Sequence, residues 1–268
     1  MTGVQETGAA ATPPASDEVA FGVDVGGSGI KGAMIDLRTG AMIDSRIKIP
    51  TPSPATPDAV AQTVRAIVDR AQWDGPVGIT LPSVIRGGVV RTAANIDRSW
   101  IGIDAVSHFR DALGGLDVRV LNDADAAGLA EDRFGGAADI DGVVMVLTFG
   151  TGIGSAILNH GMLVPNTEFG HLEVDGAEAE KRAASSARTR EELSWKKWSA
   201  EVSRVLTAIE DLVNPDVFIV GGGISRESEK WVPRLTNETP VRVATLHNTA
   251  GIAGAAITSV ASAGTVPR

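Results

Sequence analysis

Residues 19–36 read Val19-Ala-Phe-Gly-Val-Asp-Val-Gly-Gly-Ser-Gly-Ile-Lys-Gly-Ala-Met-Ile-Asp36, and residues 143–158 read Val143-Val-Met-Val-Leu-Thr-Phe-Gly-Thr-Gly-Ile-Gly-Ser-Ala-Ile-Leu158. Each stretch predicts a buried strand, a turn rich in glycine and hydroxyl residues, and a second strand. Such a turn suits phosphate, because a backbone can wrap a phosphate oxygen only where no Cβ blocks the approach. Two of these hairpins facing one cleft would form a clamp for phosphate groups.

The first turn also matches a dinucleotide-binding fingerprint, Gly27-x-Gly29-x-x-Gly32. That fingerprint requires a helix directly after the glycines, whereas here a strand continues to the turn at Arg38-Thr-Gly40. The sequence contains no Gly-Lys-Ser/Thr P-loop. The pattern therefore excludes a Walker-type nucleotide site and keeps a dinucleotide-binding oxidoreductase only as an alternative.

Composition places the chain among acidic, cysteine-free proteins. Its 268 residues, 43% of them hydrophobic, can form one large domain or two ordinary ones, and the repeated hairpin favours two. A net charge of −9 argues against nonspecific nucleic-acid binding. The absence of cysteine excludes disulfides and fits a reducing compartment. With no signal peptide and no long apolar run, we expect a cytoplasmic protein without nucleic-acid or membrane partners.

The rest of the chain alternates between expected helices and strands. Residues 1–18 predict a disordered leader. Strands are expected at 41–49, 76–80, 89–90, 118–121 and 216–220, and helices at 57–72, 107–113, 124–134, 195–213 and 249–260. Loops follow the strand ends, where α/β proteins bind ligands. The stretch from Lys181 to Arg204 holds seven basic and three acidic residues, which indicates either a solvated helix face or a path for a polyanion.

Five motifs resemble, in order, those of the ROK family of sugar kinases, within the superfamily of actin, hexokinase and heat-shock ATPases. They are Asp24-Val-Gly-Gly-Ser-Gly-Ile-Lys31, Leu121-Asn-Asp-Ala-Asp-Ala-Ala127, Thr148-Phe-Gly-Thr-Gly-Ile-Gly154, Glu168-Phe-Gly-His171 and Gly221-Gly-Gly-Ile-Ser225. The resemblance implies an α/β, two-lobed actin/hexokinase-like fold, a duplicated ribonuclease H-like unit with an interdomain cleft. It assigns residues 19–121 plus 248–262 to a small N-terminal lobe and 122–247 to a large C-terminal lobe.

Two further segments, Arg91–Gly102 and Pro165–Glu173, resemble the polyphosphate glucokinases of actinobacteria, and the whole chain is similar to the polyphosphate/ATP glucomannokinases. The resemblance implies a homodimer that phosphorylates the 6-hydroxyl of glucose and mannose, with inorganic polyphosphate or ATP as donor and Mg²⁺ as cofactor. Other ROK proteins carry a cysteine-rich zinc motif, which this chain lacks, so no zinc is expected. A strictly ATP-dependent glucokinase and a non-catalytic sugar sensor stay as alternatives.

The resemblance assigns the general base of the reaction to Asp123, beside Asn122, which would orient the sugar hydroxyl. Read as a residue alone, Asp123 also suits the N-cap of the helix that follows, and Asp125 is a competitor that spacing does not exclude. The family usually has glycine where Ser83 stands, and this difference makes mannose plausible. The expected sugar-binding residues are Pro82, Ser83, Asn95, Asn122, Asp123, Glu168, His171 and Glu180.

Donor phosphates are expected at the glycine turns, and Asp24 is expected to hold Mg²⁺ through water. Two alternatives stay open: Lys31 as a solvated strand residue and Asp24 as a turn cap. Adenosine would lie near Gly221–Gly223, and a polyphosphate chain would continue along Lys181–Lys197. The expected donor-binding residues are Asp24, Gly26, Gly27, Ser28, Gly29, Lys31, Thr151, Gly152, Gly154, Gly221, Gly222 and Gly223.

Overall fold

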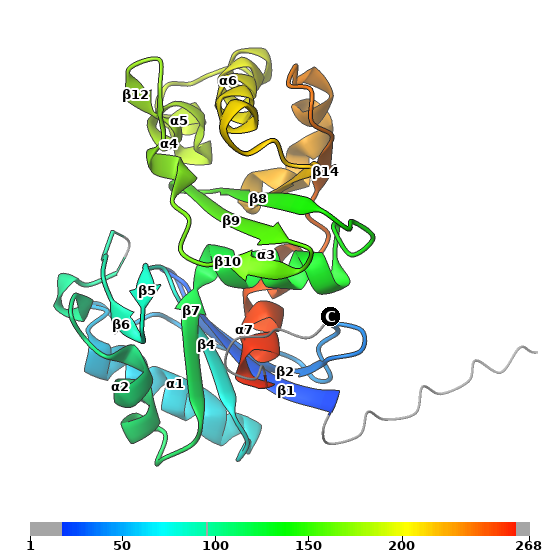
Figure 1. The fold of residues 1–268 in the computed structure, drawn as a ribbon. Helices are drawn as coiled ribbons and strands as arrows, with labels where there is room; N and C mark the ends of the chain where they lie inside the picture. The colour runs from blue at the N-terminus through cyan, green and yellow to red at the C-terminus, as the bar shows by residue number, and fades with distance from the viewer. Residues whose placement is uncertain (1–17, 95, 261–268) are drawn as a thin grey trace, which may run out of the picture.

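Two five-stranded sheets form the frame of the protein in the computed structural model, which describes residues 18–94 and 96–260 (Figure 1). The first sheet has the order β3-β2-β1-β4-β7, with β1 Val19–Val25, β2 Ile30–Asp36, β3 Ile47–Ile49, β4 Val77–Leu81 and β7 Val118–Asn122. The second has the order β10-β9-β8-β13-β14, with β8 Val143–Phe149, β9 Ile153–Asn159, β10 Met162–Val164, β13 Val217–Gly221 and β14 Val241–Val243.

The second sheet repeats the first, strand for strand. In each sheet an antiparallel hairpin comes first. Its first strand then pairs in parallel with one later strand, and that strand pairs in parallel with a further one. β1 and β8 also share one pattern of buried and half-buried positions, as expected for the repeated sequences. The turns of the two hairpins differ in length: the first spans residues 26–29 and the second residues 150–152.

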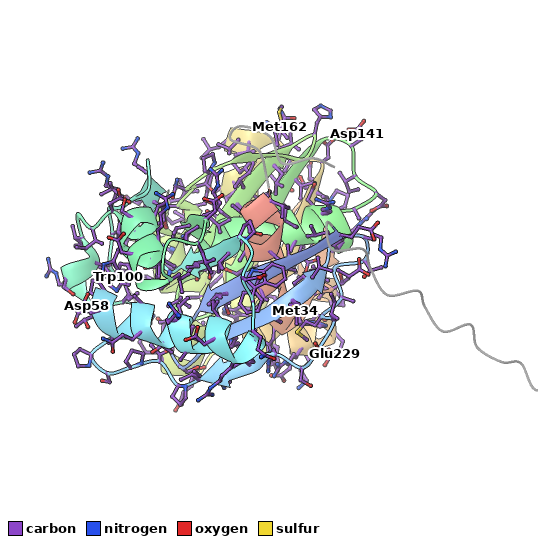
Figure 2. The ribbon with its side chains drawn as sticks, turned by 90° about the horizontal axis from the view of Figure 1, so that it is seen from below. Met34, Asp58, Trp100, Asp141, Met162 and Glu229 are labelled. Carbon is purple, nitrogen blue, oxygen red and sulfur yellow. The ribbon has the colours of Figure 1, made fainter. Side chains whose placement is uncertain are left out.

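Each sheet carries helices on its outer face. Over the first sheet lie α1, Pro57–Ala71, and α2, Ala105–Ala112. The hydroxyl of Thr56 caps the start of α1 by accepting from the N–H of Ala59, and a buried stripe of α1 faces the strands. Figure 2 shows α1 lying across the first sheet, with Asp58 and Trp100 at one end of this layer. Over the second sheet lie α4, Ala179–Ala183, α5, Ser185–Arg190, and α6, Trp195–Val213.

Two helices lie between the sheets, and each packs on the sheet that it does not follow in sequence. Helix α3, Asp123–Phe134, follows the first sheet in sequence but packs on β8 and β9, whereas α7, Ala250–Val260, follows the second sheet and packs on β1 and β4. The two helices also pack against each other (Figure 1). A Cβ at Gly22 would lie 1.9 Å from the carbonyl oxygen of Ile252, so only glycine permits this approach. Because α3 packs on the second sheet and α7 on the first, we propose that residues 19–121 plus 248–262 form the small lobe and residues 122–247 the large lobe.

Several details differ from the sequence prediction. The strand expected at 41–49 is interrupted: Met42 forms an isolated bridge to Ile35, and β3 covers only residues 47–49. Small elements were not foreseen, because their two or three residues are too short for a periodic pattern. They are β5 Ile85–Arg86, β11 Glu173–Val174, β12 Ala177–Glu178, η2 Arg98–Trp100, η3 Phe169–His171, η5 Val232–Arg234 and η6 His247–Thr249, together with the longer η4 Gly223–Lys230. The short strand expected at residues 89–90 is confirmed as β6, Val89–Val90.

Some predictions fall outside the described residues. These are the expected leader apart from Glu18, the expected sugar ligand Asn95, and residues 261–262 of the small lobe. Glu18 itself belongs to the fold, because its carbonyl accepts a hydrogen bond from the N–H of Leu37. Within residues 18–94 and 96–260, none of the helices has both the length and the apolar character that crossing a bilayer requires.

Candidate active site

The first site element is the junction at which β7 ends and α3 begins. The Oδ1 of Asn122 accepts hydrogen bonds from the N–H groups of Ala124, at 2.8 Å, and Asp125, at 3.1 Å, so Asn122 is the N-cap of α3. Its Nδ2 donates to the carbonyl of Ser83 at 3.2 Å. The alternative prediction that Asp123 is the N-cap of this helix was wrong, because Asn122 occupies that position. The carboxyl of Asp123 accepts from the N–H of Ala124 at 2.9 Å and is exposed.

Other carboxylates surround Asp123. Although the Asp123 side chain is exposed at its surface, the protein atoms around it limit its hydration, and this desolvation is the largest cause that raises its pKa. The negative charges of Asp24 and, more weakly, Glu168 act in the same direction, and together they raise the pKa of Asp123 to about 6. A carboxyl with this pKa is ionised at neutral pH and still basic enough to accept a proton.

Asp24 occupies the end of β1, next to the first glycine turn, residues 26–29. Its Oδ2 forms an ion pair with the Nζ of Lys31 at 3.1 Å, and its Oδ1 accepts from the hydroxyl of Thr80 at 3.0 Å. The Lys31 side chain is 21% exposed, so the alternative of a solvated strand residue is wrong. The bonds found for Asp24 go to two side chains rather than to turn amides, which argues against the turn-cap alternative.

The first glycine turn borders a cavity of about 340 Å³. Gly26 closes the turn by donating to the carbonyl of Gly29 at 3.3 Å, and the hydroxyl of Thr51 donates to the carbonyl of Gly26 at 2.5 Å. Gly27 and Ser28 are exposed at the tip. The residues that line the cavity are Val25, Gly26, Gly27, Thr51, Pro52, Ser53, Ala55, Pro82, Ala94, Ile96 and Asp97. The cavity therefore joins the first donor turn to Pro82 of the expected sugar site.

The second glycine turn, residues 150–152, is held by helix α5. The N–H of Ser186 donates to the carbonyl of Gly150 at 3.1 Å, and its hydroxyl donates to the carbonyl of Thr151 at 2.5 Å. The Glu180 carboxylate packs against the same turn, since a Cβ at Gly152 would lie 2.3 Å from Glu180 Oε2. The expected donor residue Gly152 and the expected sugar residue Glu180 are thus brought together.

The loop after β10 carries Glu168 and His171. Ser155 of β9 anchors it: its hydroxyl donates to the carbonyl of Thr167 at 2.8 Å and accepts from the N–H of Phe169 at 3.0 Å. His171 Nδ1 lies 3.4 Å from Glu178 Oε1. One ligand atom each from His171, Glu178 and Glu180 lie within 4.8 Å of one another, a spacing that can hold a metal ion. Burial raises the pKa of Glu168, and the charge of Glu180 adds to the shift.

The third glycine turn, residues 221–223, packs behind the second. Gly222 has a φ of 87°, and a Cβ there would lie 2.3 Å from the carbonyl oxygen of Phe149, directly before the second turn. Gly223 is open, because a Cβ at this position would meet no side chain within 4 Å in the described part of the chain. Gly154, in contrast, lies within β9, where its missing side chain lets Ala124 of α3 approach. The structure therefore gives Gly154 a packing role beside its expected role in donor binding.

The sequence profile of the ROK family matches residues 20–186. The chain belongs to the ROK family. It is 59% identical over 241 residues to the polyphosphate glucokinase of Mycobacterium tuberculosis (strain CDC 1551 / Oshkosh), and the match covers 90% of this chain and 91% of that protein.

Solved ROK structures have the same fold. The inorganic polyphosphate/ATP-glucomannokinase of Arthrobacter sp. strain KM matches with a TM-score of 0.84 and 47% identity, over 89% of this chain and 97% of that one. A ROK glucokinase of Streptomyces griseus, in complex with glucose and AMPPNP, matches with a TM-score of 0.75 and 25% identity, and the match covers 89% of this chain and 98% of that one. The predicted α/β, two-lobed actin/hexokinase-like fold is confirmed.

Sequence reasoning missed several residues of this ROK site. Glu178 contacts His171, and Thr80 binds Asp24, but neither belongs to a glycine-rich motif. Asn166 was also missed, although it stands two positions before Glu168. A polar residue at the end of a buried strand was the available signal for Thr80. Asn166 offered no comparable signal, because its partners Ile85 and Asp125 lie 81 and 41 positions away in sequence. Glu178 stands close to its partner His171 in sequence, but no motif singled it out.

Asp125 is the most deeply buried carboxyl of the site, at 1% exposure. Its Oδ2 accepts from the N–H of Asn166 at 2.8 Å, and its Oδ1 has no hydrogen-bond partner among the described residues. Burial, followed by the charges of Glu168 and Asp123, raises its pKa to about 7, against the opposing hydrogen bond from Asn166. Asp125 therefore carries a proton for much of the time at neutral pH.

Replacing Asp125 with Asn tests this assignment through stability. An unfolded Asp titrates near pH 4, so the raised pKa of Asp125 lowers the stability of the wild type as pH rises from about 4 to about 7. Asn cannot ionise and retains an acceptor for Asn166. The melting temperature of Asp125→Asn relative to the wild type should therefore be higher at pH 8 than at pH 5. Asp74→Asn, at an exposed position, is the control. An equal difference at both pH values would contradict the raised pKa.

Proposed function

We propose that the protein transfers a phosphoryl group from inorganic polyphosphate or ATP to the 6-hydroxyl of glucose. The single observation that carries the proposal is the Asp123 carboxyl, exposed at the start of α3 and raised in pKa by burial and by Asp24. The glycine turn beside Asp24 supplies donor amides, and Glu168 lies on the sugar side. Membership in the ROK family and the similarity to a polyphosphate glucokinase support the same reaction.

Asp123 acts as the general base that accepts the proton of the sugar hydroxyl as the phosphoryl group arrives. Asn122 supports it by capping α3 and tying the helix start to Ser83. Glu168, His171 and Glu180 bind other hydroxyls of the sugar. His171 is held by Glu178, and we assign it a sugar contact without zinc. Closure around the sugar would exclude water and favour transfer over hydrolysis.

The sugar site extends to the turn after β4. Ser83 is 3% exposed, and its Oγ has no hydrogen-bond partner within the described part of the chain. A buried hydroxyl without a partner is rare in folded proteins, which supports a bound sugar hydroxyl as the missing partner. We propose that Pro82, Ser83 and Asn95 line this side and that mannose is accepted together with glucose.

The donor lies between the first and second glycine turns. Backbone N–H groups, the Ser28 and Thr151 hydroxyls and the Lys31 ammonium are its proposed ligands, and the third turn borders the adenosine of ATP. Asp24 fits a water-mediated Mg²⁺ site, because its repulsion of the Asp123 carboxylate would be relieved by a cation there. When bound, Mg²⁺ neutralises negative charge on the donor phosphates.

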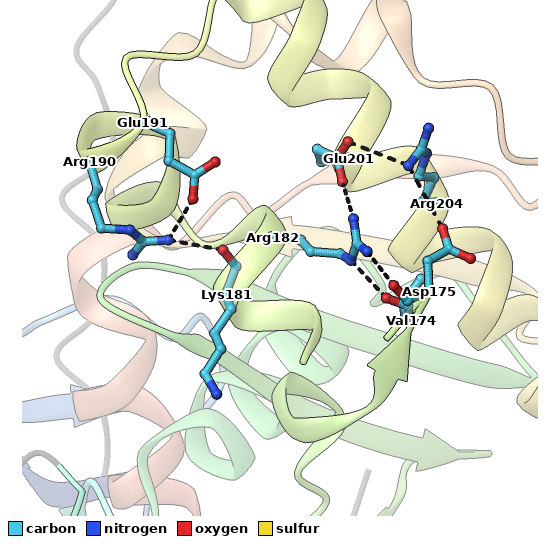
Figure 3. Close-up of polar contacts among 8 residues, drawn as sticks. All are labelled: Val174, Asp175, Lys181, Arg182, Arg190, Glu191, Glu201 and Arg204. Carbon is cyan, nitrogen blue, oxygen red and sulfur yellow. Dashed lines mark hydrogen bonds and ion pairs between the residues drawn. The ribbon is translucent and has the colours of Figure 1, made fainter. Parts of the chain in front are cut away.

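Ion pairs already occupy several of the cations between Lys181 and Lys197, the proposed path for a polyphosphate chain. Lys181 pairs with Glu178 at 2.6 Å. Arg182 pairs with Glu201 at 3.1 Å, and Arg190 pairs with Glu191 at 2.9 Å (Figure 3). These three cations are already neutralised locally.

Arg188 differs from these cations. Its guanidinium lies 3.7 Å from the centre of the Trp195 ring, and its Nε is buried with no hydrogen-bond partner among the described residues. It stands two residues after Ser186, which holds the second glycine turn. Lys196 instead lines a separate groove of about 800 Å³ along α6, where cations and carboxylates are mixed. We therefore assign the polyphosphate path to Arg188.

We also propose a cytoplasmic homodimer. The absence of cysteine from the sequence supports a reducing compartment. Met162 and Val164 are 67% and 48% exposed on β10, the edge strand of the second sheet. Such an exposed apolar edge supports contact with a second copy.

The direct test crosses glucose and mannose against ATP and nucleotide-free polyphosphate, with and without Mg²⁺, and measures sugar 6-phosphate. We expect sugar 6-phosphate from glucose with either donor and from mannose. Removal of Mg²⁺ should abolish product formation from both sugars. Product with ATP alone would replace the proposal by a strictly ATP-dependent glucokinase. Sugar binding without any product would favour a non-catalytic sugar sensor.

Asp123→Asn tests the general base. Because the carboxamide cannot accept the proton, kcat should fall by roughly 10²- to 10⁴-fold, while the Kd of glucose stays within about threefold. In the wild type, kcat should decline below about pH 6 as Asp123 becomes protonated, and the variant should lose this decline. Initial rates from pH 5 to 8 measure kcat and its pH dependence, and glucose titrations measure the Kd. Weaker glucose binding with kcat preserved would contradict the assignment.

Arg188→Gln tests the polyphosphate path, with Arg190→Gln as the matched control on the same helix. Loss of one charge-assisted phosphate contact should raise the KM for polyphosphate roughly tenfold and leave the KM for glucose unchanged. Arg190 is already paired with Glu191, so its variant should keep the wild-type KM. Equal KM values for polyphosphate in both variants would contradict the path.

A further inference from the structure

Asn166 connects the loop after β10 to β5, a short strand that pairs with β6 outside the two five-stranded sheets. It follows β10 of the second sheet and adopts a left-handed backbone with φ of 61°. Its Oδ1 accepts from the N–H of Ile85 at 2.7 Å, and its Nδ2 donates to the carbonyl of Ile85 at 2.9 Å. The Asn166 side chain thus pairs with the backbone of β5, a strand that follows the first sheet's β4.

The backbone of Asn166 makes a third bond, from its N–H to Asp125 Oδ2 at 2.8 Å. Asp125 belongs to the first turn of α3, two residues after Asp123. Asn166 is therefore bonded to the strand after the Ser83 turn and to the helix that carries Asp123, and it precedes Glu168 in the same loop. We call the two hydrogen bonds to Ile85 and the one to Asp125 the Asn166 latch.

The latch holds a long loop whose other anchor is Ser155 of β9. Ser155 fixes the loop to the second sheet alone, so it does not set the distance between Glu168 and the Ser83 turn. Asn166 sets that distance, because both polar atoms of its side chain bind the backbone of one residue of β5. Its left-handed backbone also turns the chain toward Glu168 directly after this contact.

We propose that Asn166 is a positioning residue for the sugar site, which holds the Glu168–His171 loop in register with the Ser83 turn and the start of α3. This inference rests on the proposed function, since it concerns how the same sugar is bound. Asn166 touches neither sugar nor donor. It acts through Glu168 and Ser83, so its loss should weaken sugar binding and leave donor binding intact.

Asn166→Gly tests the latch without straining the backbone, because glycine adopts positive φ freely and keeps the N–H bonded to Asp125. Asn214→Gly is the matched control: Asn214 also has positive φ, at 48°, but caps the far end of α6. Loss of the two bonds to Ile85 should raise the Kd of glucose, measured by calorimetry without donor, about tenfold. The KM for glucose should rise in parallel, and the KM for ATP should stay within about twofold.

The control should retain the wild-type Kd even if both variants lose similar thermal stability. A Kd of glucose for Asn166→Gly within about twofold of the wild type would overturn the proposal and leave Asn166 a structural residue. If Asn166→Gly does not fold, Asn166→Asp carries the test, because it keeps the acceptor for Ile85 and loses the donor. Its Kd should rise about threefold, and an unchanged Kd would overturn the proposal. A wild-type protein that binds no glucose would contradict the proposed function rather than the latch.

Discussion

The packing of α3 against α7 is the contact on which the rest of the structure depends. Each helix leaves one sheet and packs on the other, so the pair joins the two halves of a duplicated fold. Small residues make the contact possible: a Cβ at Gly254 would lie 1.8 Å from the carbonyl oxygen of Ala126. Because α3 begins at Asp123, the same packing that joins the halves also places the proposed base at their boundary.

A concentration of carboxyl groups is the second feature of the site. Asp24, Asp123, Asp125 and Glu168 act on one another through their charges, which is visible in the raised pKa values of Asp123 and Asp125. Only Lys31 forms an ion pair with a member of this set among the described residues. Such crowding lowers the stability of the fold at neutral pH, and it gives the basic carboxylate that the proposed chemistry requires.

Much of the fold could be predicted from local patterns. The two hairpins, their glycine turns and the long helices follow from periodicity, and the structure has all of them. The interrupted strand before β3 and the short elements near the cleft could not be predicted, because contacts to distant residues decide them. The grouping of Asp123 with Asp24 and Glu168 came from a family resemblance, since no spacing rule relates residues separated by this much chain.

The sequence alone determined the two strand–turn–strand units, their duplication and the residue types available for phosphate and sugar. Apolar alternation and glycine placement act within a few residues, so they can be read without a fold. Only the tertiary structure decided that Asn122 caps α3, that Glu180 packs on Gly152, and that Asn166 pairs with Ile85. The contacts of Glu180 and Asn166 join residues far apart in the chain, 81 positions for Asn166 and Ile85, so they form only in the folded protein. For the cap, Asn122 and Asp123 are both suitable residue types, and only the position at which α3 begins selects Asn122.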